Sequence, residues 1–396
     1  MVNNNYTPTE YICPVCKSPD NDVFLEITRV PVHCNLLWEI RNEAVDAPRS
    51  DITLAFCKNC GHIFNRTFDP EVMKYFQQYE NSLHFSQCFQ NYAKELVDRL
   101  IASNNLYKKD IIEIGCGKGE FLKLLCETGE NRGIGFDPSY EIVEPTSGND
   151  SGAITFIKDF YSKEYSDYKA DFICCRHVLE HIEHPYDFLF DIRKTIGKKI
   201  DTIVFFEVPN VDYTLKELGI WDLIYEHISY FNKSSLHRLF SLCGFSIIKL
   251  TETFNGQFLC IEAVPGKVLH GTEYTLNITR HNVELFAEKY WDKIKTWQKK
   301  IEHIRQSGQS AVVWGAGSKG VTFLNLIDPK GQIEYIIDIN PRKQGKYVPG
   351  TGQKILPPEF MREYQPDVVL VMNVIYKGEI QQILDSFGVS ACLINV

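Results

Sequence analysis

Residues 110–120 read DIIEIGCGKGE, an apolar strand pattern followed by three glycines at alternate positions, and a helical pattern continues to residue 129. Glycine lets the backbone turn sharply and approach a ligand closely, as a nucleoside-binding loop requires. The next apolar run, GIGFD, ends at Asp137, where a carboxylate can accept hydrogen bonds from both hydroxyls of a ribose. This stretch therefore predicts a βαβ unit of a Rossmann-like sheet with a nucleoside at its loop.

Further apolar runs continue the alternation of strand and helix patterns along the chain. They are ITFIKD, ADFICCRHV, TIVFFEV, FSIIKLTETF and QFLCIEAV, which predict a mostly parallel sheet finished by antiparallel strands. Before this sheet, residues 75–102 predict a helix rich in aromatic side chains. After it, residues 283–306 predict one long polar helix that leads to a second strand and helix series starting at Ser310.

The spacing of the glycines separates two classes of nucleoside ligand. The dinucleotide fingerprint G-x-G-x-x-G requires glycine at position 120, where this chain has Glu120. The pattern E-x-G-x-G-x-G before an acidic strand end resembles the S-adenosylmethionine-dependent methyltransferases of the Rossmann-like class. In that class Asp159 would contact the adenine amine and His177 would form a wall of the cofactor pocket. The S-adenosylmethionine contacts that the resemblance implies are Glu113, Gly115, Gly117, Gly119, Asp137, Asp159 and His177.

Thirteen cysteines are an unusual number for a chain of 396 residues. Cys13 and Cys16 form one C-x2-C pair, and Cys57 and Cys60 form a second. Each pair can place two thiolates on one metal ion, and two pairs complete a tetrahedral four-sulfur site. Because disulfides are rare in a reducing compartment, the remaining cysteines are expected to be small core residues. The spacing predicts a structural zinc ion.

Composition and charge exclude several classes of protein. Hydrophobic residues at 44% and charged residues at 23% describe a globular chain with several cores. No run approaches the roughly 20 apolar residues that span a bilayer, and no signal peptide is evident, so we expect a cytoplasmic protein without a membrane partner. The net charge of −9 disfavours a nucleic-acid partner, although a zinc-ribbon nucleic-acid methyltransferase stays an alternative.

The order of these segments is similar to that of the sugar C-methyltransferases, which are best known for C-3 methylation of nucleotide-linked 4-keto-deoxysugars. Besides the cysteines and the glycine loop, the resemblance rests on Tyr79-Glu80-Asn81-Ser82, RHVLEH at 176–181, Val208-Pro209-Asn210 and WDLIYEH at 221–227. It implies an α/β protein whose Rossmann-like methyltransferase sheet is flanked by an N-terminal zinc-binding module and a C-terminal Rossmann-like half-domain. It also implies a monomer that acts on a nucleotide-linked ketosugar.

This order predicts four segments in the chain. The zinc-binding module is expected over 1–68 and the methyltransferase domain with its helical lead-in over 69–267. A helical connector is expected over 268–306 and the C-terminal Rossmann-like domain over 307–396.

Methylation of carbon requires a carbanion equivalent, and a neighbouring ketone makes the C–H bond acidic enough for a general base. Histidine suits this task because its unperturbed pKa is about 6.5. His227 is the predicted base, since it follows a central strand at the edge where ligands bind, and the resemblance favours the same residue. Glu226 is expected to support the imidazole. The predicted donors to the developing oxyanion are Tyr225, His181 and Tyr79, and Asn210 is a predicted substrate contact.

A second glycine-rich turn, GAGSKG at 315–320, is a complete G-x-G-x-x-G, and Asp338 ends the next strand pattern. This turn is the argument for an alternative function, an NAD-linked nucleotide-sugar oxidoreductase. Too little chain follows Asp338 for the second half of a full dinucleotide fold, so we expect the loop to hold the diphosphate of the substrate instead. The predicted contacts in this cleft are Gly317, Ser318, Lys319, Arg342 and Lys343.

Overall fold

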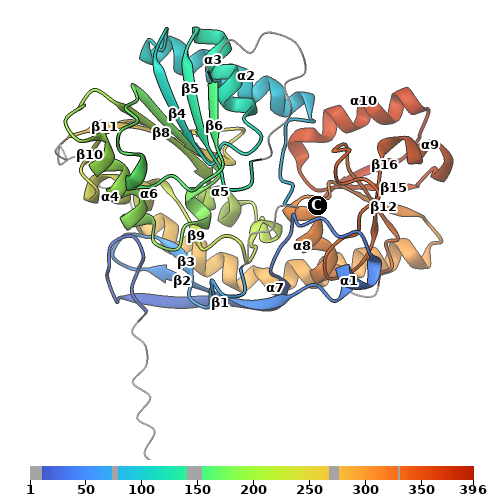
Figure 1. Cartoon of the computed structure of the whole chain (residues 1–396). Coiled ribbons are helices and arrows are strands. Elements are labelled where there is room, and N and C mark those ends of the chain that lie inside the picture. Colours follow the sequence, from blue (N-terminus) through green and yellow to red (C-terminus); the bar gives the residue numbers. More distant parts are fainter. Residues whose placement is uncertain (1–10, 74–78, 141–153, 267–275, 329–330) are drawn as a thin grey trace, which may run out of the picture.

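The computed structural model describes residues 11–73, 79–140, 154–266, 276–328 and 331–396. Within them the chain forms three β-sheets, each with its own strand order. The central sheet and the C-terminal sheet stand side by side, and β1 and the long helix α7 run beneath both (Figure 1). The two glycine-rich turns therefore belong to different sheets of one molecule.

The central sheet has seven strands among the described residues, in the order β10-β11-β8-β7-β4-β5-β6. Its strands are β4 (Asp110–Ile114), β5 (Arg132–Phe136), β6 (Ile154–Ile157), β7 (Phe172–Arg176), β8 (Ile203–Pro209), β10 (Phe245–Thr253) and β11 (Phe258–Pro265). The strands from β4 to β8 pair in parallel, whereas β11 is antiparallel to both of its neighbours. The predicted parallel sheet with antiparallel final strands is confirmed.

Helices cover both faces of this sheet, because alternate side chains of each buried strand point to opposite sides. One face packs against α2 (Gln87–Asn104) and α3 (Glu120–Gly129), and the other against α4 (Pro185–Ile196) and α6 (Lys233–Leu242). In β7, for example, Phe172 lies in the first of these cores and Ile173 in the second. The short helix α5 (Val211–Lys216) follows β8 at the carboxyl edge of the sheet.

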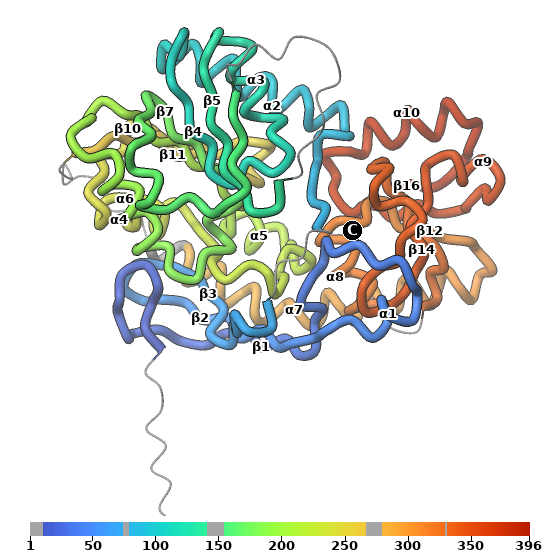
Figure 2. The backbone as a smooth tube through the Cα atoms, viewed as in Figure 1, coloured from blue at the N-terminus to red at the C-terminus, as the bar shows by residue number. Residues whose placement is uncertain are grey.

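The N-terminal sheet has the order β1-β2-β3-β9. Its strands are β1 (Asn21–Pro31), β2 (Arg49–Cys57), β3 (Ile63–Asn65) and β9 (Ser229–Tyr230), with α1 (Arg41–Val45) between the first two. Figure 2 shows this part of the chain passing from beneath the central sheet to the C-terminal domain, where α1 lies. The strand β9 follows His227 directly, so the cysteine-bearing module is hydrogen-bonded to the loop that carries the predicted base.

The C-terminal sheet contains five parallel strands in the described residues, in the order β14-β13-β12-β15-β16. They are β12 (Ala311–Trp314), β13 (Tyr335–Ile337), β14 (Lys354–Leu356), β15 (Val368–Val371) and β16 (Cys392–Asn395), accompanied by α8 (Ser318–Ile327), α9 (Met361–Tyr364) and α10 (Lys377–Phe387). This is the strand order 3-2-1-4-5 of a dinucleotide-type sheet. The predicted half-domain therefore builds five of the six strands of that order.

The helix predicted over 75–102 begins only at Gln87, and residues 74–78 lie outside the described part of the chain. The side chain of Ser86 caps α2 by accepting a hydrogen bond from the Phe89 N–H. Tyr79 instead forms an isolated β-bridge with Leu36. The prediction is wrong for Tyr79 to Ser86 because contacts with distant segments outweigh the helical spacing of the aromatic residues.

Helix α7 (Leu276–Gln306) is longer than the predicted helix and is polar on only one side. Buried apolar residues recur on it every three or four positions. They are Val283, Phe286, Tyr290, Ile294, Trp297, Ile301 and Ile304. This stripe packs against β1, α5 and α8. The predicted long helix is therefore confirmed, and it is amphipathic rather than polar on all sides. In the part of the chain that the structure describes, no helix has the length and apolarity to cross a membrane.

Candidate active site

The first glycine loop joins β4 to α3, next to β7 in the sheet. Gly115, Gly117 and Gly119 all have positive φ angles, of 70°, 53° and 80°. A Cβ on Gly115 would lie 2.2 Å from Cγ2 of Val178, and one on Gly119 would lie 2.4 Å from the Phe156 ring. A Cβ on Gly117 would meet no atom within 4 Å, so the loop is pressed against its neighbours at both ends and open at its centre.

Two carboxylates stand beside this opening, at the ends of β5 and β6. The N–H groups of Asp137 and Asp159 both donate to the carbonyl of Ile157, at 3.1 and 2.9 Å. Oδ2 of Asp137 accepts from the Gly117 N–H at 2.8 Å, and Oδ1 accepts from Ser139. A carboxylate has about four acceptor positions and Asp137 uses three of them, so about one stays available for a ribose hydroxyl.

Asp159 has a different set of partners. Its carboxylate accepts from the Tyr165 hydroxyl at 2.5 Å and from the Phe160 N–H at 2.7 Å, and these hydrogen bonds lower the pKa of Asp159. An ionised acceptor at this edge fits an adenine amine.

Glu113 is buried below the loop. Burial raises its pKa to about 8, although the nearby Arg176 opposes that shift. Among the described residues, Oε2 of Glu113 has no hydrogen-bond partner. The open centre of the loop, the acceptors at the strand ends and this unpaired oxygen together fit the nucleoside and amino groups of S-adenosylmethionine.

His177 ends β7 with a φ angle of 53°, an uncommon conformation for a residue with a Cβ. Its Nε2 lies 3.1 Å from Oε1 of Glu207, and its Nδ1 lies 3.7 Å from Oε1 of Glu180. Burial alone would lower the pKa of His177, but hydrogen bonding to these two carboxylates raises it to about 9. The predicted pocket wall is thus a cationic imidazole at neutral pH. Arg176 also binds Glu207, at 2.9 Å.

His181 and His227 meet edge to face, with ring centroids 4.9 Å apart. Nδ1 of His181 lies 2.9 Å from the carbonyl oxygen of Glu226, and the Ile228 N–H donates to the Glu180 carbonyl at 2.9 Å. These two hydrogen bonds join the 3-10 turn Leu179–His181 to the loop before β9. The structure therefore brings together two predicted residues that are far apart in the sequence.

The protonation state of His227 differs from the expectation behind its choice as base. Burial lowers its pKa to about 3, and the neighbouring His181 adds to this effect. The imidazole of His227 is therefore neutral, with a free lone pair, throughout the physiological pH range. Its basicity is weaker than that of an unperturbed histidine.

Three further predicted residues contact the N-terminal segment. The Tyr225 hydroxyl accepts from the Asp69 N–H at 2.8 Å. Oε2 of Glu226 accepts from the backbone N–H of Cys34 at 3.0 Å. The side chain of Glu226 therefore binds the N-terminal segment, whereas its backbone carbonyl binds His181. Nδ2 of Asn35 donates to the Tyr79 hydroxyl at 3.5 Å.

Asn210 occupies the N-cap of α5. Its Oδ1 accepts from the Asp212 N–H, and its Nδ2 donates to the Gly256 carbonyl at 2.8 Å. These contacts are those of a structural cap at the carboxyl end of β8.

Sequence reasoning missed Glu180 and Glu207, which surround the histidines. Glu180 lies in the RHVLEH motif without a predicted role, yet it is buried with an oxygen near His177. The run Arg176-His177-x-x-Glu180-His181 is the sequence feature that indicates such carboxylates. Two cations and a carboxylate in a strand-end motif indicate a buried charge network.

The predicted cations of the C-terminal loop already have partners in this chain. Nζ of Lys319 lies 2.7 Å from Asp222, and Arg342 lies 3.1 Å from Glu80. Lys343 is buried and donates to Oδ1 of Asn35 and to the Ala316 carbonyl. These cations therefore tie the C-terminal domain to the residues around the first site.

The turn itself starts α8. Gly317 is the N-cap and Ser318 the first helical residue, and a Cβ on Gly317 would meet no atom within 4 Å. Both oxygens of Asp338 accept backbone N–H groups, from Ala316 and Asn340. The space above the turn is thus open, while the strand-end carboxylate is engaged by the protein.

The four predicted metal ligands converge, although they come from two separate turns. Sγ atoms of Cys13 and Cys60 lie 3.7 Å apart, and those of Cys16 and Cys57 lie 3.6 Å apart. All four sulfurs are within 4.8 Å of one another. The side chain of Asn59 donates to Cys16 at 3.4 Å, as a hydrogen bond around a thiolate site would.

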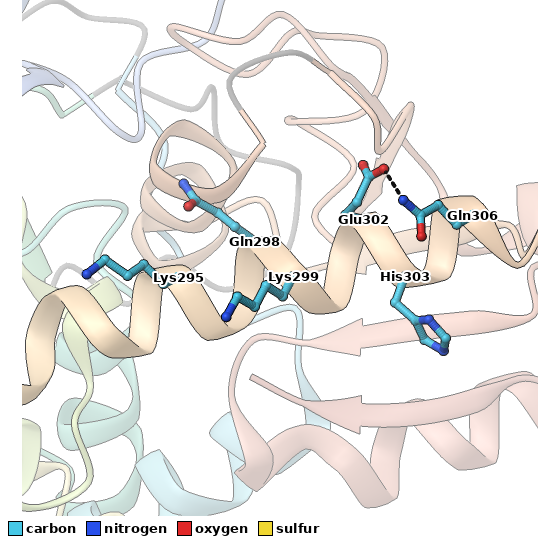
Figure 3. A pocket seen from close by; sticks show the side chains of 6 residues that line it. All are labelled: Lys295, Gln298, Lys299, Glu302, His303 and Gln306. Atoms are coloured by element: carbon cyan, nitrogen blue, oxygen red, sulfur yellow. Dashed lines mark hydrogen bonds between the residues drawn. The ribbon is translucent and has the colours of Figure 1, made fainter.

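A hollow of about 400 Å³ runs along α7 and is lined by six of its residues (Figure 3). They are Lys295, Gln298, Lys299, Glu302, His303 and Gln306. The hollow is shallow and lies on the polar side of one helix, away from the strand ends. None of the predicted site residues lines this hollow.

The strand order and the glycine loop define a Rossmann-like methyltransferase. A family model for a methyltransferase domain matches residues 84–250, and one for a C-methyltransferase C-terminal domain matches residues 269–390. The chain belongs to the S-adenosylmethionine-dependent C-methyltransferase family that joins these two domains. It therefore transfers a methyl group from S-adenosylmethionine to carbon.

Several known proteins are similar to this chain. The C-methyltransferase NovU of Streptomyces niveus is 24% identical over 394 residues, which cover 93% of this chain and 90% of NovU. The magnesium protoporphyrin IX methyltransferase ChlM from Synechocystis is 20% identical over 45% of this chain and 84% of its own, with a TM-score of 0.34. The riboflavin-derivative dimethyltransferase RosA from Streptomyces davawensis is 18% identical, over 45% and 54%, with a TM-score of 0.37.

Proposed function

We propose that the protein methylates a carbon next to the ketone of a nucleotide-linked 4-keto-deoxysugar, with C-3 as the position. The observation that carries this proposal is the pair of imidazoles, His181 and His227, beside the carboxylate of Glu180 at the carboxyl edge of the sheet. A carbon without a lone pair needs a base before it can be methylated, and this pair offers one.

In this mechanism His227 accepts the proton from the carbon next to the ketone. Its neutral state makes the lone pair available, and Glu180 stabilises the imidazolium that forms. The Tyr79 hydroxyl donates a hydrogen bond that stabilises the negative charge on the ketone oxygen. The predicted donor role of His181 is not part of this mechanism, because its Nδ1–H already donates to the Glu226 carbonyl. Bound S-adenosylmethionine supplies an electrophilic methyl group on a positively charged sulfur.

The matches of both halves of the chain to methyltransferase domains weigh against the NAD-linked alternative. The open space above Gly317 suits a diphosphate at the start of α8, where Lys319 and Arg342 are partly exposed.

Reversal of the charge at Lys319 tests the diphosphate role. We expect Lys319→Glu to weaken binding of the nucleotide sugar about tenfold or more, roughly 1.4 kcal/mol, and to leave S-adenosylmethionine binding unchanged. Titration calorimetry measures both affinities. Lys319→Met removes the positive charge without adding a carboxylate that Asp222 would repel, so it separates these two effects. Lys295→Glu reverses a charge on the exposed side of α7 and is the matched control. Equal affinity in all four proteins would refute the role.

The four converging cysteines are proposed to hold a structural Zn²⁺ ion. A closed four-sulfur set with a hydrogen bond from Asn59 suits such a site. None of the thirteen cysteines is in a disulfide in the described part of the chain, which agrees with action in the reducing cytoplasm. A monomer is the proposed state, and size-exclusion chromatography tests it.

Mass spectrometry of the product tests the proposed reaction. The purified enzyme, S-adenosylmethionine and a panel of 4-ketosugar nucleotides should give a product heavier by one CH₂ group, with the new methyl on C-3. Exchange of the C-3 hydrogen in deuterated water without the methyl donor would report the enolate separately. A panel that shows neither methylation nor exchange would contradict the substrate class.

A further inference from the structure

Glu180, His181 and His227 form a cluster of metal-ligating side chains that is separate from the four cysteines. One ligand atom from each residue lies within 4.8 Å of the others. Glu180 and His181 are adjacent on a 3-10 turn, and the hydrogen bonds of that turn to the loop at 226–228 hold His227 against them. Both histidines are only half-buried, so an ion from solvent can reach them.

One ring nitrogen of His181 is available to bind a metal ion. The Glu226 carbonyl can only accept a hydrogen bond, so Nδ1 of His181 carries the proton and Nε2 keeps its lone pair. Metal-bound histidines usually donate their other N–H in this way, which fixes the tautomer and the ring.

Glu180 adds a carboxylate with an unused oxygen. It is 2% exposed, and among the described residues its Oε2 has no hydrogen-bond partner, while Oε1 faces His177. A buried oxygen without a donor is costly unless a cation or a proton completes it.

We propose that these three residues bind a divalent transition-metal ion, with Zn²⁺ as the probe, and that the bound ion reversibly inhibits methyl transfer. Two imidazoles and one carboxylate are a ligand set that Zn²⁺, Co²⁺ and Ni²⁺ accept. Ligands about 2.1 Å from a tetrahedral ion lie about 3.4 Å apart, so the cluster has to contract by at most about 1.4 Å. Rotation of the half-buried rings supplies that movement.

Inhibition follows from the lone pair that the metal takes. A nitrogen of His227 that is bonded to Zn²⁺ cannot accept a proton from the substrate. This second part of the proposal rests on the proposed function, whereas binding of the metal does not. The two parts therefore have separate measurements.

Binding is measured on the full-length protein as zinc per chain after incubation with excess Zn²⁺ and gel filtration. We expect the unmodified protein to retain one more zinc ion per chain than either Glu180→Gln or His181→Asn. The four cysteines are the same in all three proteins, so zinc bound there does not change this difference. His184→Asn changes an exposed neighbour on the same segment and should retain the full amount. The visible absorption spectrum of the Co²⁺-loaded protein gives a second readout. Co²⁺ in this cluster adds absorption bands without the charge-transfer bands that a cysteine thiolate ligand produces.

Equal zinc content in the unmodified protein and both cluster variants would overturn the site. Folding of each variant is established by S-adenosylmethionine binding, and Glu180→Gln keeps the shape of the side chain. Zn²⁺ should lower methyl transfer at least about tenfold, with recovery in a weak chelator. Binding of the extra ion without inhibition would contradict the inhibitory part and count against His227 as the base.

Discussion

Replacement of His227 by Asn should reduce methyl transfer by about 10²- to 10⁴-fold and leave S-adenosylmethionine binding unchanged, because general bases contribute rate factors of that size. The asparagine amide keeps much of the ring's polarity but cannot accept the proton. Single-turnover transfer of a labelled methyl group and cofactor titration measure the two quantities. We expect exchange of the C-3 hydrogen to fall in parallel, since it reports proton removal alone.

The matched control is His184→Asn, which changes an exposed imidazole near the same strand end. It should keep full activity. A His227→Asn enzyme with turnover within about threefold of the unmodified protein would exclude His227 as the base. The base would then be His181, whose Nε2 carries a free lone pair when Nδ1 binds the Glu226 carbonyl.

Much of the fold could be predicted from the sequence because it depends on local signals. The loop at Gly115 to Gly119 needs positive φ angles that favour glycine, and the strand before it is an uninterrupted apolar run. The end of β5 at Asp137 is likewise marked by a single acidic residue after apolar ones. A few adjacent residues determine each of these features.

The wrong predictions concern features that depend on distant partners. Residues before Gln87 have helical spacing, yet Tyr79 pairs with Leu36 and Glu80 binds Arg342, and no local pattern encodes either contact. For α7, the many charged residues on one side conceal a buried stripe, which packs against β1, α5 and α8.

The sequence predicts several residues of the candidate site, but not the hydrogen bonds and ion pairs between them. His181 and His227 were both named, but sequence spacing cannot tell which carboxylate approaches an imidazole. The carboxylate of Glu226 binds the Cys34 N–H, whereas Glu180 approaches the histidines. Burial also could not be predicted, and burial lowers the pKa of His227 far below the value that made it attractive as a base.

Replacement of Cys57 by Ser should cause the largest loss of stability. The binding free energy of a structural zinc ion is folding free energy, about 10 to 16 kcal/mol in zinc-finger peptides at pH 7, and a missing thiolate forfeits much of it. Cys57 ends β2 and Cys60 lies in the turn before β3, so loss of the ion loosens β2 and β3, and β3 is the strand that pairs with β9. We expect zinc content to fall to that of the chelated protein and the thermal transition to drop by about 5 °C or more.

The same change should reduce methyl transfer, although Cys57 does not belong to the reacting groups. Phe64 of β3 pairs with Ser229, and the Asn65 N–H donates to the Ile228 carbonyl at 2.9 Å, one residue after His227. Disorder in β3 therefore reaches the loop that holds His227 against His181. Cys392→Ser, at an exposed cysteine of β16, should leave zinc content, thermal stability and turnover unchanged. Unaltered zinc content and stability in Cys57→Ser would show that the four sulfurs hold no structural ion.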